Sequence, residues 1–464
     1  MRAQVKRKIA DLFVLALFSL LTGAAAGVVV TLYTVLAHYG ESCSVSLYAE
    51  IFARPYFIPL LLAALLLAAI AIGTAVRFVP MARGSGVPQA EGAARGLFRL
   101  KWYSALCTMF AASLAAVFLG LGAGTEGPSV LMGGCFGECA ADLSGADKRN
   151  RGALVAAGAG AGLAVAFNAP LTGVLFAAEE AKKKIDPSVV VSALIAVVSA
   201  LVVRGGLRKL ISLADPEIAP FAPTFSAYDL TAADTFAEIF AMLGAALAVA
   251  VLAAALGAAF YASVFALKKL LGKLTFLKGA GRMTVPFLLA GALGMISLLV
   301  MGGGHSLVQA VGTSGGTQEM SAALNFASPL AVALAVLLVM KFAATACNIG
   351  AGVPCGAFVP MLAIGACAGA LAAQAAAAAG MPAAYSDTVV MLFVAAFFSA
   401  VVKAPVTSAV MIFELTGSYN FALLLPTAAA VATAYLLSSL MRVRPLYDAL
   451  LVGYVFPGGK ARLR

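Results

Sequence analysis

The chain has little charge, almost no histidine and no polar stretch long enough for a separate soluble domain. Only 11% of its 464 residues are charged, while 62% are hydrophobic. A water-soluble surface cannot be built from so little charge, so we expect the chain to fold in a lipid bilayer. With two histidines, no Gly-Lys phosphate loop and no HExxH sequence, it also lacks the usual pairings of a nucleophile with a base.

The cysteines indicate neither a disulfide framework nor a metal site. There are seven, an odd number, and most lie in apolar sequence rich in Gly and Ala, where free thiols behave as small hydrophobic groups. Cys135 and Cys139 have a helical four-residue spacing that could suggest a metal, but no second ligand pair follows them. We therefore predict no metal and no cofactor.

The sequence contains long apolar runs without a charged residue. Seven of them are long enough, or nearly so, to cross about 30 Å of hydrocarbon. They are Leu12–Ala37, Pro55–Val76, Trp102–Thr125, Pro187–Val203, Ile239–Leu267, Met320–Met340 and Leu415–Met441. The first run is too long for the core of a signal peptide, so we expect it to remain as a helix.

Basic residues cluster between the apolar runs, as they do in the cytoplasmic loops of membrane proteins. Such residues mark both ends of the chain: Arg2, Lys6, Arg7 and Lys8 at one end, and Lys460, Arg462 and Arg464 at the other. Between two spans lies an acidic loop with Asp215, Glu217, Asp229, Asp234 and Glu238. We therefore expect a multi-pass protein of the cell inner (plasma) membrane, with both termini cytoplasmic and an even number of crossings.

Two parts of the chain resemble each other. NAPLTGVLFAAEE, around Glu179, matches KAPVTSAVMIFEL, around Glu414, at a constant offset, and a glycine-rich break precedes each copy, at Gly122 and Gly350. Interrupted hydrophobic segments at matching places in two halves indicate a site near the membrane midplane. We predict a single membrane domain over residues 1–464, with repeat halves at roughly 80–205 and 320–440 and no soluble C-terminal domain.

The first break contains an acid, Glu126, in GTEGPS. Pro128 suits the first turn of a helix, so Glu126 should lie where a helix begins, and unpaired N–H groups there attract anions. The acid could simply cap that helix. Inside a membrane, however, an acid costs roughly 2.5–3.5 kcal/mol and usually marks an ion or proton path.

Two further breaks offer groups that could bind an anion. In GAFVP, only the main-chain N–H groups of Ala357 and Phe358 are available, and the break could instead serve close helix packing. In GSGVP, Ser85 adds a hydroxyl to what could be an ordinary turn. Tyr447 follows the last apolar run, where it could donate into a pore or anchor the chain at the interface.

GSGVP, GTEGP, GAFVP and the late tyrosine, in this order, resemble the chloride channel (CLC) family of chloride channels and chloride/proton antiporters. The resemblance covers nearly the whole chain. It implies an all-α integral membrane fold, an inverted-topology repeat of many tilted and half-spanning helices, and a homodimer with one pore in each subunit. It further implies that Ser85, Tyr447, Ala357 and Phe358 bind chloride and that Glu126 is the gating glutamate.

Glu180 looks like the internal proton glutamate of antiporters in this family, although it could merely be solvated beside Lys182–Lys184. It favours chloride/proton exchange over a passive chloride channel of the same fold; an intramembrane enzyme is the remaining alternative. Ser85 argues against the fluoride-selective branch. Two residues depart from the family pattern: Thr125 replaces the usual basic residue, which removes a positive charge from the outer entrance, and Cys355 replaces a glycine.

Overall fold

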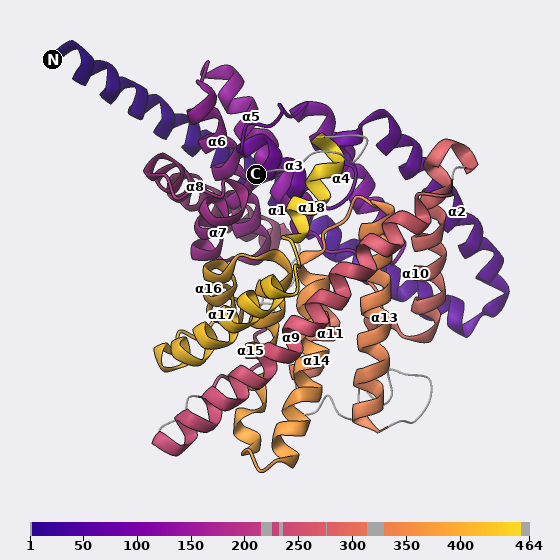
Figure 1. Cartoon of the computed structure of the whole chain (residues 1–464). Coiled ribbons are helices and arrows are strands. Elements are labelled where there is room, and N and C mark those ends of the chain that lie inside the picture. Colours follow the sequence, from indigo (N-terminus) through magenta and orange to yellow (C-terminus); the bar gives the residue numbers. More distant parts are fainter. Residues whose placement is uncertain (1, 215–224, 232–234, 275, 313–328, 456–464) are drawn as a thin grey trace.

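The computed structural model describes residues 2–214, 225–231, 235–274, 276–312 and 329–455. This part of the chain is helical, and its one extended contact is an isolated bridge (Figure 1). The α-helices are α1 (Arg2–Ala53), α2 (Ile58–Phe78), α3 (Val87–Ala94), α4 (Trp102–Phe118), α5 (Glu126–Leu143), α6 (Lys148–Phe167), α7 (Pro170–Phe176), α8 (Pro187–Ala214), α9 (Phe236–Leu271), α10 (Thr284–Ile296), α11 (His305–Gly312), α13 (Leu330–Ala351), α14 (Phe358–Ala378), α15 (Ser386–Val402), α16 (Pro405–Thr416), α17 (Leu424–Leu440) and α18 (Leu446–Val455). A π-helical turn, η3 (Ala177–Ala181), continues α7.

Within the described residues, eight helices are long and apolar enough to cross a membrane. Three of them were not among the predicted runs: Lys148–Phe167, Phe358–Ala378 and Ala383–Val402. The first and the last of these are almost wholly enclosed by protein. α6 is rich in glycine and alanine, which lowers its hydropathy but lets α5 come close. A Cβ added at Gly133 would overlap the carbonyl of Gly158, so this approach requires glycine.

The bounds of three predicted runs differ from those of the helices that the structure has there. The helix that starts at Trp102 ends at Phe118, and the run Leu415–Met441 covers the end of α16 and all of α17 rather than one span. α4 and α16 end at glycines with left-handed backbone conformation, Gly120 (φ 76°) and Gly417 (φ 72°). A search for uncharged, apolar sequence does not detect such helix ends. The first half of Met320–Met340 lies outside the described residues.

The residues that match between the two repeats hold the halves together by exchanging helix caps. The carboxylate of Glu414 accepts hydrogen bonds from the main-chain N–H (2.7 Å) and the hydroxyl (2.6 Å) of Thr172, in the first turn of α7. Glu179 accepts the same two bonds from Thr407 in the first turn of α16, at 2.6 Å each. Glu179 therefore caps a helix of the other half.

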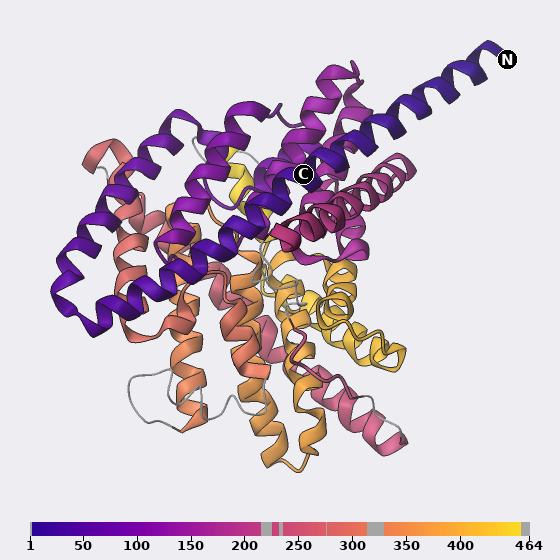
Figure 2. The same ribbon diagram turned by 180° about the vertical axis from the view of Figure 1, so that it is seen from behind.

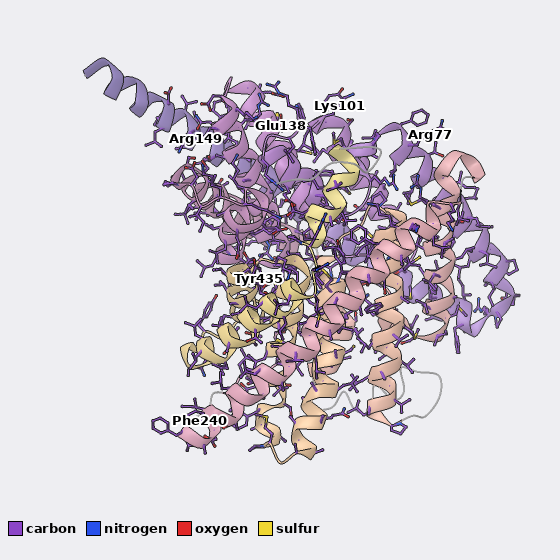
Figure 3. The ribbon with its side chains drawn as sticks, viewed as in Figure 1. Arg77, Lys101, Glu138, Arg149, Phe240 and Tyr435 are labelled. Carbon is purple, nitrogen blue, oxygen red and sulfur yellow. The ribbon has the colours of Figure 1, made fainter. Side chains whose placement is uncertain are left out.

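Four charged side chains mark one edge of the molecule. Arg77, Lys101, Glu138 and Arg149 lie along the upper edge in Figure 3, the side on which α1 begins. From there α1 runs obliquely across the molecule to the left side of Figure 2. Of the terminal and loop charges used to predict orientation, Asp215, Glu217, Asp234, Lys460, Arg462 and Arg464 lie outside the described residues.

Candidate functional site

The two matching glycine-rich breaks meet inside the protein. Gly124 and Gly356 form an antiparallel bridge, with N–H to O distances of 3.0 Å and 2.6 Å. Two residues after each of these glycines a helix begins, α5 at Glu126 and α14 at Phe358. The first N–H groups of each helix have no partner in their own helix and carry partial positive charge. The bridge thus brings two positive helix ends together.

The third break joins the same place. The N–H of Gly84 donates to the carbonyl of Gly352 at 3.0 Å, and Gly86 (φ 87°) precedes α3. Gly127 lies between the breaks, since a Cβ there would overlap the carbonyl oxygen of Ser85 and stand 2.9 Å from the Cα of Gly356. The three breaks singled out in the sequence therefore form one structure, with the N-termini of α3, α5 and α14 around it.

Two hydroxyl groups are buried here without a partner. The Oγ of Ser85 and the Oη of Tyr447 have no hydrogen-bond partner among the described residues, and Tyr447 is fully buried. α18 carries Tyr447 and packs against α3, which begins two residues after Ser85. A buried hydroxyl with no partner costs about 1–3 kcal/mol, so both are free to donate to a bound anion.

Glu126 is only 1% exposed at the start of α5. Its Oε1 accepts a hydrogen bond from the hydroxyl of Thr125 at 2.9 Å and lies 3.7 Å from Nε2 of His305. Its Oε2 has no hydrogen-bond partner among the described residues. The side chain therefore occupies the helix end as an anion would, with one oxygen uncommitted.

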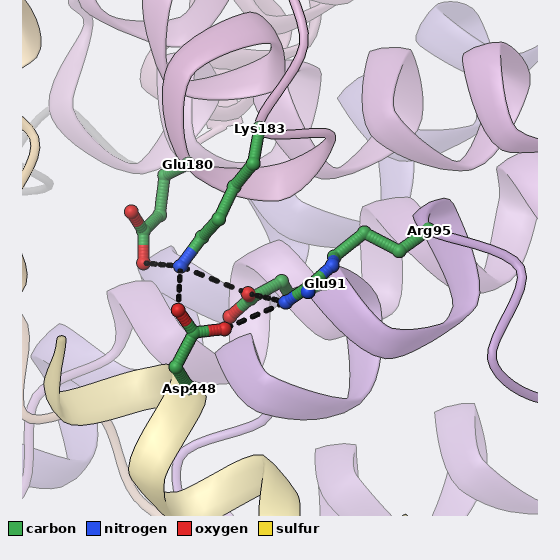
Figure 4. A network of polar contacts seen from close by, with 5 residues as sticks. All are labelled: Glu91, Arg95, Glu180, Lys183 and Asp448. Atoms are coloured by element: carbon green, nitrogen blue, oxygen red, sulfur yellow. Dashed lines mark hydrogen bonds and ion pairs between the residues drawn. The ribbon is translucent and has the colours of Figure 1, made fainter. Parts of the chain in front are cut away.

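Glu180, also buried, belongs to a network of five charged residues (Figure 4). Lys183 lies at its centre, with Nζ 3.7 Å from Glu180, 3.0 Å from Glu91 and 2.7 Å from Asp448. Arg95 pairs with Glu91 at 2.7 Å and with Asp448 at 2.6 Å. Three carboxylates thus share two cations, and the network ties α18 to α3 and η3.

The positions of Tyr447 and Glu180 are linked through this network. Asp448 directly follows Tyr447, so its two ion pairs hold the turn of α18 that presents the phenol. The hydroxyl of Tyr447 lies within electrostatic reach of both Glu126 and Glu180. Glu180 occupies a π-helical turn, an irregularity that is common at functional sites. Tyr447 thus interacts electrostatically with both acids that the sequence singled out.

The structure adds charged groups that the sequence interpretation missed. Lys341, which only ended an apolar run in the sequence, lies in the middle of α13, is fully buried and donates to the carbonyls of Val300 (3.0 Å) and Gly302 (2.8 Å). The available signal was that apolar sequence continues after Lys341, which places a lysine inside a hydrophobic segment. Asp448 gave no such signal, because only the packing of α18 on α3 brings it to Arg95 and Lys183. Lys183 was expected beside Glu180, but its ion pair with Glu91 was not.

Fold and site together define a multi-pass membrane protein whose centre attracts anions. Residues 66–439 match the family model of voltage gated chloride channels, and the chain therefore belongs to that family, the CLC family. The H(+)/Cl(-) exchange transporter ClcA of Vibrio parahaemolyticus is 30% identical over 447 residues, 95% of this chain and 89% of that protein. ClcA of Vibrio cholerae is 31% identical, with the same coverage.

Solved structures share the fold. A slow cyanobacterial Cl⁻/H⁺ antiporter superposes with a TM-score of 0.81 at 22% identity, covering 95% of this chain and 98% of that one. A eukaryotic CLC transporter gives 0.68 at 22% identity, covering 96% and 74%. The protein is thus an all-α integral membrane protein of CLC type, with inverted repeats and many half-spanning helices.

Proposed function

We propose that the protein exchanges chloride for protons across the membrane. Ser85 and Tyr447 donate hydroxyl hydrogen bonds to a central chloride, and the N–H groups of Ala357 and Phe358 face it from the start of α14. The uncommitted buried hydroxyls and the convergent helix ends support this site. The Vibrio relatives named as H(+)/Cl(-) exchange transporters support the substrates.

The observation that carries the proposal is the position of Glu126. Its buried carboxylate stands at the N-terminus of α5, beside the Gly124–Gly356 bridge, where a passing anion would also be stabilised. A charged Glu126 therefore competes with chloride. Once protonated, it has no charge to hold it there and leaves the path to the anion. Coupling follows because one carboxylate both carries the proton and competes with chloride.

Glu180 is the proposed entry point for protons from the cytoplasmic side. It is buried next to Lys183, in the network that ties α18 to α3 and η3. A proton on Glu180 weakens its attraction to Lys183, so the network of Figure 4 responds to proton loading. We expect Glu180→Gln to slow proton movement and to leave chloride movement in place.

Proteoliposomes with chloride and pH electrodes test the proposal. An imposed chloride gradient should drive protons uphill through the wild type. Glu126→Ala should keep chloride flux and lose both coupled proton flux and the pH dependence of chloride flux. Glu50→Ala, at an exposed helix position paired with Arg54, is the matched control and should behave as the wild type. A wild type that moves chloride without protons would make the protein a passive channel, and coupled flux in Glu126→Ala would remove the gating role.

We propose transport rather than an enzymatic activity for the chain, and the relatives named as exchange transporters support this assignment. Retention of anion flux with loss of a hydrolytic activity in Ser85→Ala would overturn this assignment.

We also propose an inner-membrane location with both termini cytoplasmic. The upper edge in Figure 3 carries Arg77, Lys101 and Arg149, and Lys182–Lys184 follow η3 at the network of Figure 4. Excess positive charge favours the cytoplasmic side. A cysteine introduced at Lys101 should react with membrane-impermeant thiol reagents only after cells are opened; labelling of intact cells would reverse the orientation.

A further inference from the structure

The only two histidines of the chain meet next to Glu126. His38 lies on α1 and His305 is the first residue of α11, yet their ring centroids are 5.8 Å apart, with the rings inclined at 44°. On its other side, Nε2 of His305 stands 3.7 Å from Oε1 of Glu126. Three titratable side chains from α1, α11 and α5 thus form a row.

Exposure changes in one direction along this row. The side chain of Glu126 is 1% exposed and that of His305 is 19% exposed, while His38 is an exposed residue. The row therefore leads from the surface to the buried carboxylate. It approaches Glu126 from the side of His305, whereas the Glu180 network reaches the site past Tyr447, so the two ends of the pathway have different proton-carrying groups.

Other charged groups face the histidines. Glu41 lies one turn after His38 on α1, against Gly302, and acts on His305 together with Lys341 of α13. Arg208 of α8 acts on His38. Glu41 and Glu126 attract a proton to the pair, and Lys341 and Arg208 repel it. Charges of both signs therefore face the histidine pair.

We propose that His38 and His305 pass protons between the outer solution and Glu126, and that they set how exchange depends on external pH. The inference rests on the proposed gating role of Glu126. Imidazole suits the task because its ordinary pKa, about 6.5, lies in the range over which outer pH varies. Thr125, adjacent to Glu126, has a hydroxyl that cannot accept a charge at these pH values.

The step involves protons alone. His38 takes a proton from water and passes it to one ring nitrogen of His305. The N–H bond at Nε2 of His305 then breaks as an O–H bond forms on Glu126, which neutralises the carboxylate. The reverse sequence releases a proton to the outer solution. At 3.7 Å, Nε2 and Oε1 need to approach by less than 1 Å for a normal hydrogen bond, which a small rotation of the imidazole supplies.

The test compares His305→Gln and His38→Gln with Ser306→Ala, an exposed neighbour of His305, as the matched control. Coupled proton flux into proteoliposomes is measured while pH is varied from about 5 to 8, where histidine titrates. We expect His305→Gln to reduce proton flux roughly tenfold and to flatten its pH profile, because a positioned proton carrier accelerates transfer by at least this factor. Ser306→Ala should keep the wild-type profile.

Two further results separate the relay from the proposed function. In a Glu126→Ala background, His305→Gln should leave chloride flux unchanged, since the relay has no acceptor there. A coupled wild type whose pH profile survives both histidine substitutions would overturn the relay alone, whereas coupled flux in Glu126→Ala would overturn the gating role. His38 is exposed, so His38→Gln should fold normally, and an unchanged profile in that variant also counts against the relay.

Discussion

At the residue scale, Gly127 is the most constrained position of the site. A Cβ there would overlap the carbonyl oxygen of Ser85 and stand 2.9 Å from the Cα of Gly356, so Gly127→Ala must push the three breaks apart. We expect a loss of about 1–3 kcal/mol in stability, as in other overpacked cores. Chloride binding should weaken too, because the N-termini of α3 and α5 would separate.

The unfolding midpoint in detergent and chloride titration calorimetry measure these two effects. Gly205→Ala on α8 is the control, since a Cβ there meets nothing within 4 Å. It should be neutral or slightly stabilising, because alanine favours helix. Equal midpoints and equal affinities for the two variants would contradict the proposed close approach at Gly127.

Asp186, between η3 and α8, should contribute a pH-dependent part of the stability. Hydrogen bonds from Arg149, at 2.8 and 3.2 Å, and from Ser188 hold the pKa of Asp186 at about 2, below its ordinary value of 3.8. Because the folded-state pKa is lowered, this stabilisation is fully present above about pH 4 and disappears as the pH falls towards 2.

Melting temperatures recorded from pH 7 down to the acid range test this contribution. Asp186→Asn should melt at a lower temperature than the wild type at pH 7, and the difference should shrink as the pH falls through that acid interval. Asp11→Asn, at an exposed helix position, is the control. A constant difference at every pH would show that the carboxylate acts through its shape rather than its charge.

Single residues were predictable where backbone geometry required them. The Gly and Pro spacing of GTEGPS located the start of α5, and Glu126 lies at that helix start as predicted. The roles of Ser85, Tyr447, Ala357 and Phe358 remain predictions. The histidine pair and the ion pair of Lys183 with Asp448 could not be foreseen, because contacts between distant segments depend on how α1, α11 and α18 pack.

At the scale of helices, the exchanged caps should contribute strongly to folding. The carboxylates of Glu179 and Glu414 each accept bonds from a main-chain N–H and a hydroxyl at the start of a helix in the other half. Hydrogen bonds to a charged group are each worth about 1.5–3 kcal/mol. We therefore expect Glu414→Gln, at the more buried of the two sites, to lower the unfolding free energy by an amount in that range.

Thermal unfolding of the purified protein measures the effect, with Glu50→Gln as an exposed control. Glu179→Gln should destabilise the protein in the same way, because its contacts are equivalent. If Glu414→Gln matched the wild type while Glu179→Gln did not, the two caps would not be equivalent.

Helix positions were predictable from hydropathy only where the helix faces lipid. α2, α8 and α9 carry many exposed apolar side chains and coincide with predicted runs. α6 and α15 are enclosed by protein, so their composition follows packing against neighbours rather than contact with lipid, and the search for charge-free runs missed both.

At the scale of the whole molecule, one chain contains every group of the proposed pathway. Ser85, Glu126, Phe358 and Tyr447 all come from the same polypeptide, so a homodimer would have two independent pathways. We expect light scattering on the detergent-solubilised protein to give twice the chain mass. A mass equal to that of one chain would contradict the proposed homodimer but not the proposed pathway within each chain.

Independence can be measured on linked dimers. A tandem fusion of one wild-type copy to one Glu126→Ala copy should retain coupled proton flux from its wild-type half, while its other half moves chloride without protons. Complete loss of coupling in the tandem would show that the two pathways depend on each other.

The exchanged caps relate the two halves of the chain by symmetry. In a pair of identical chains related by a twofold axis, a contact from residue i to residue j is repeated from j to i, and Glu179 with Thr407 and Glu414 with Thr172 are such a pair of contacts within one polypeptide. The two halves thus contact each other as the subunits of a symmetric dimer would. The symmetry ends at the site, where one half carries the acid Glu126 and the other begins α14 with an uncharged segment at Ala357 and Phe358.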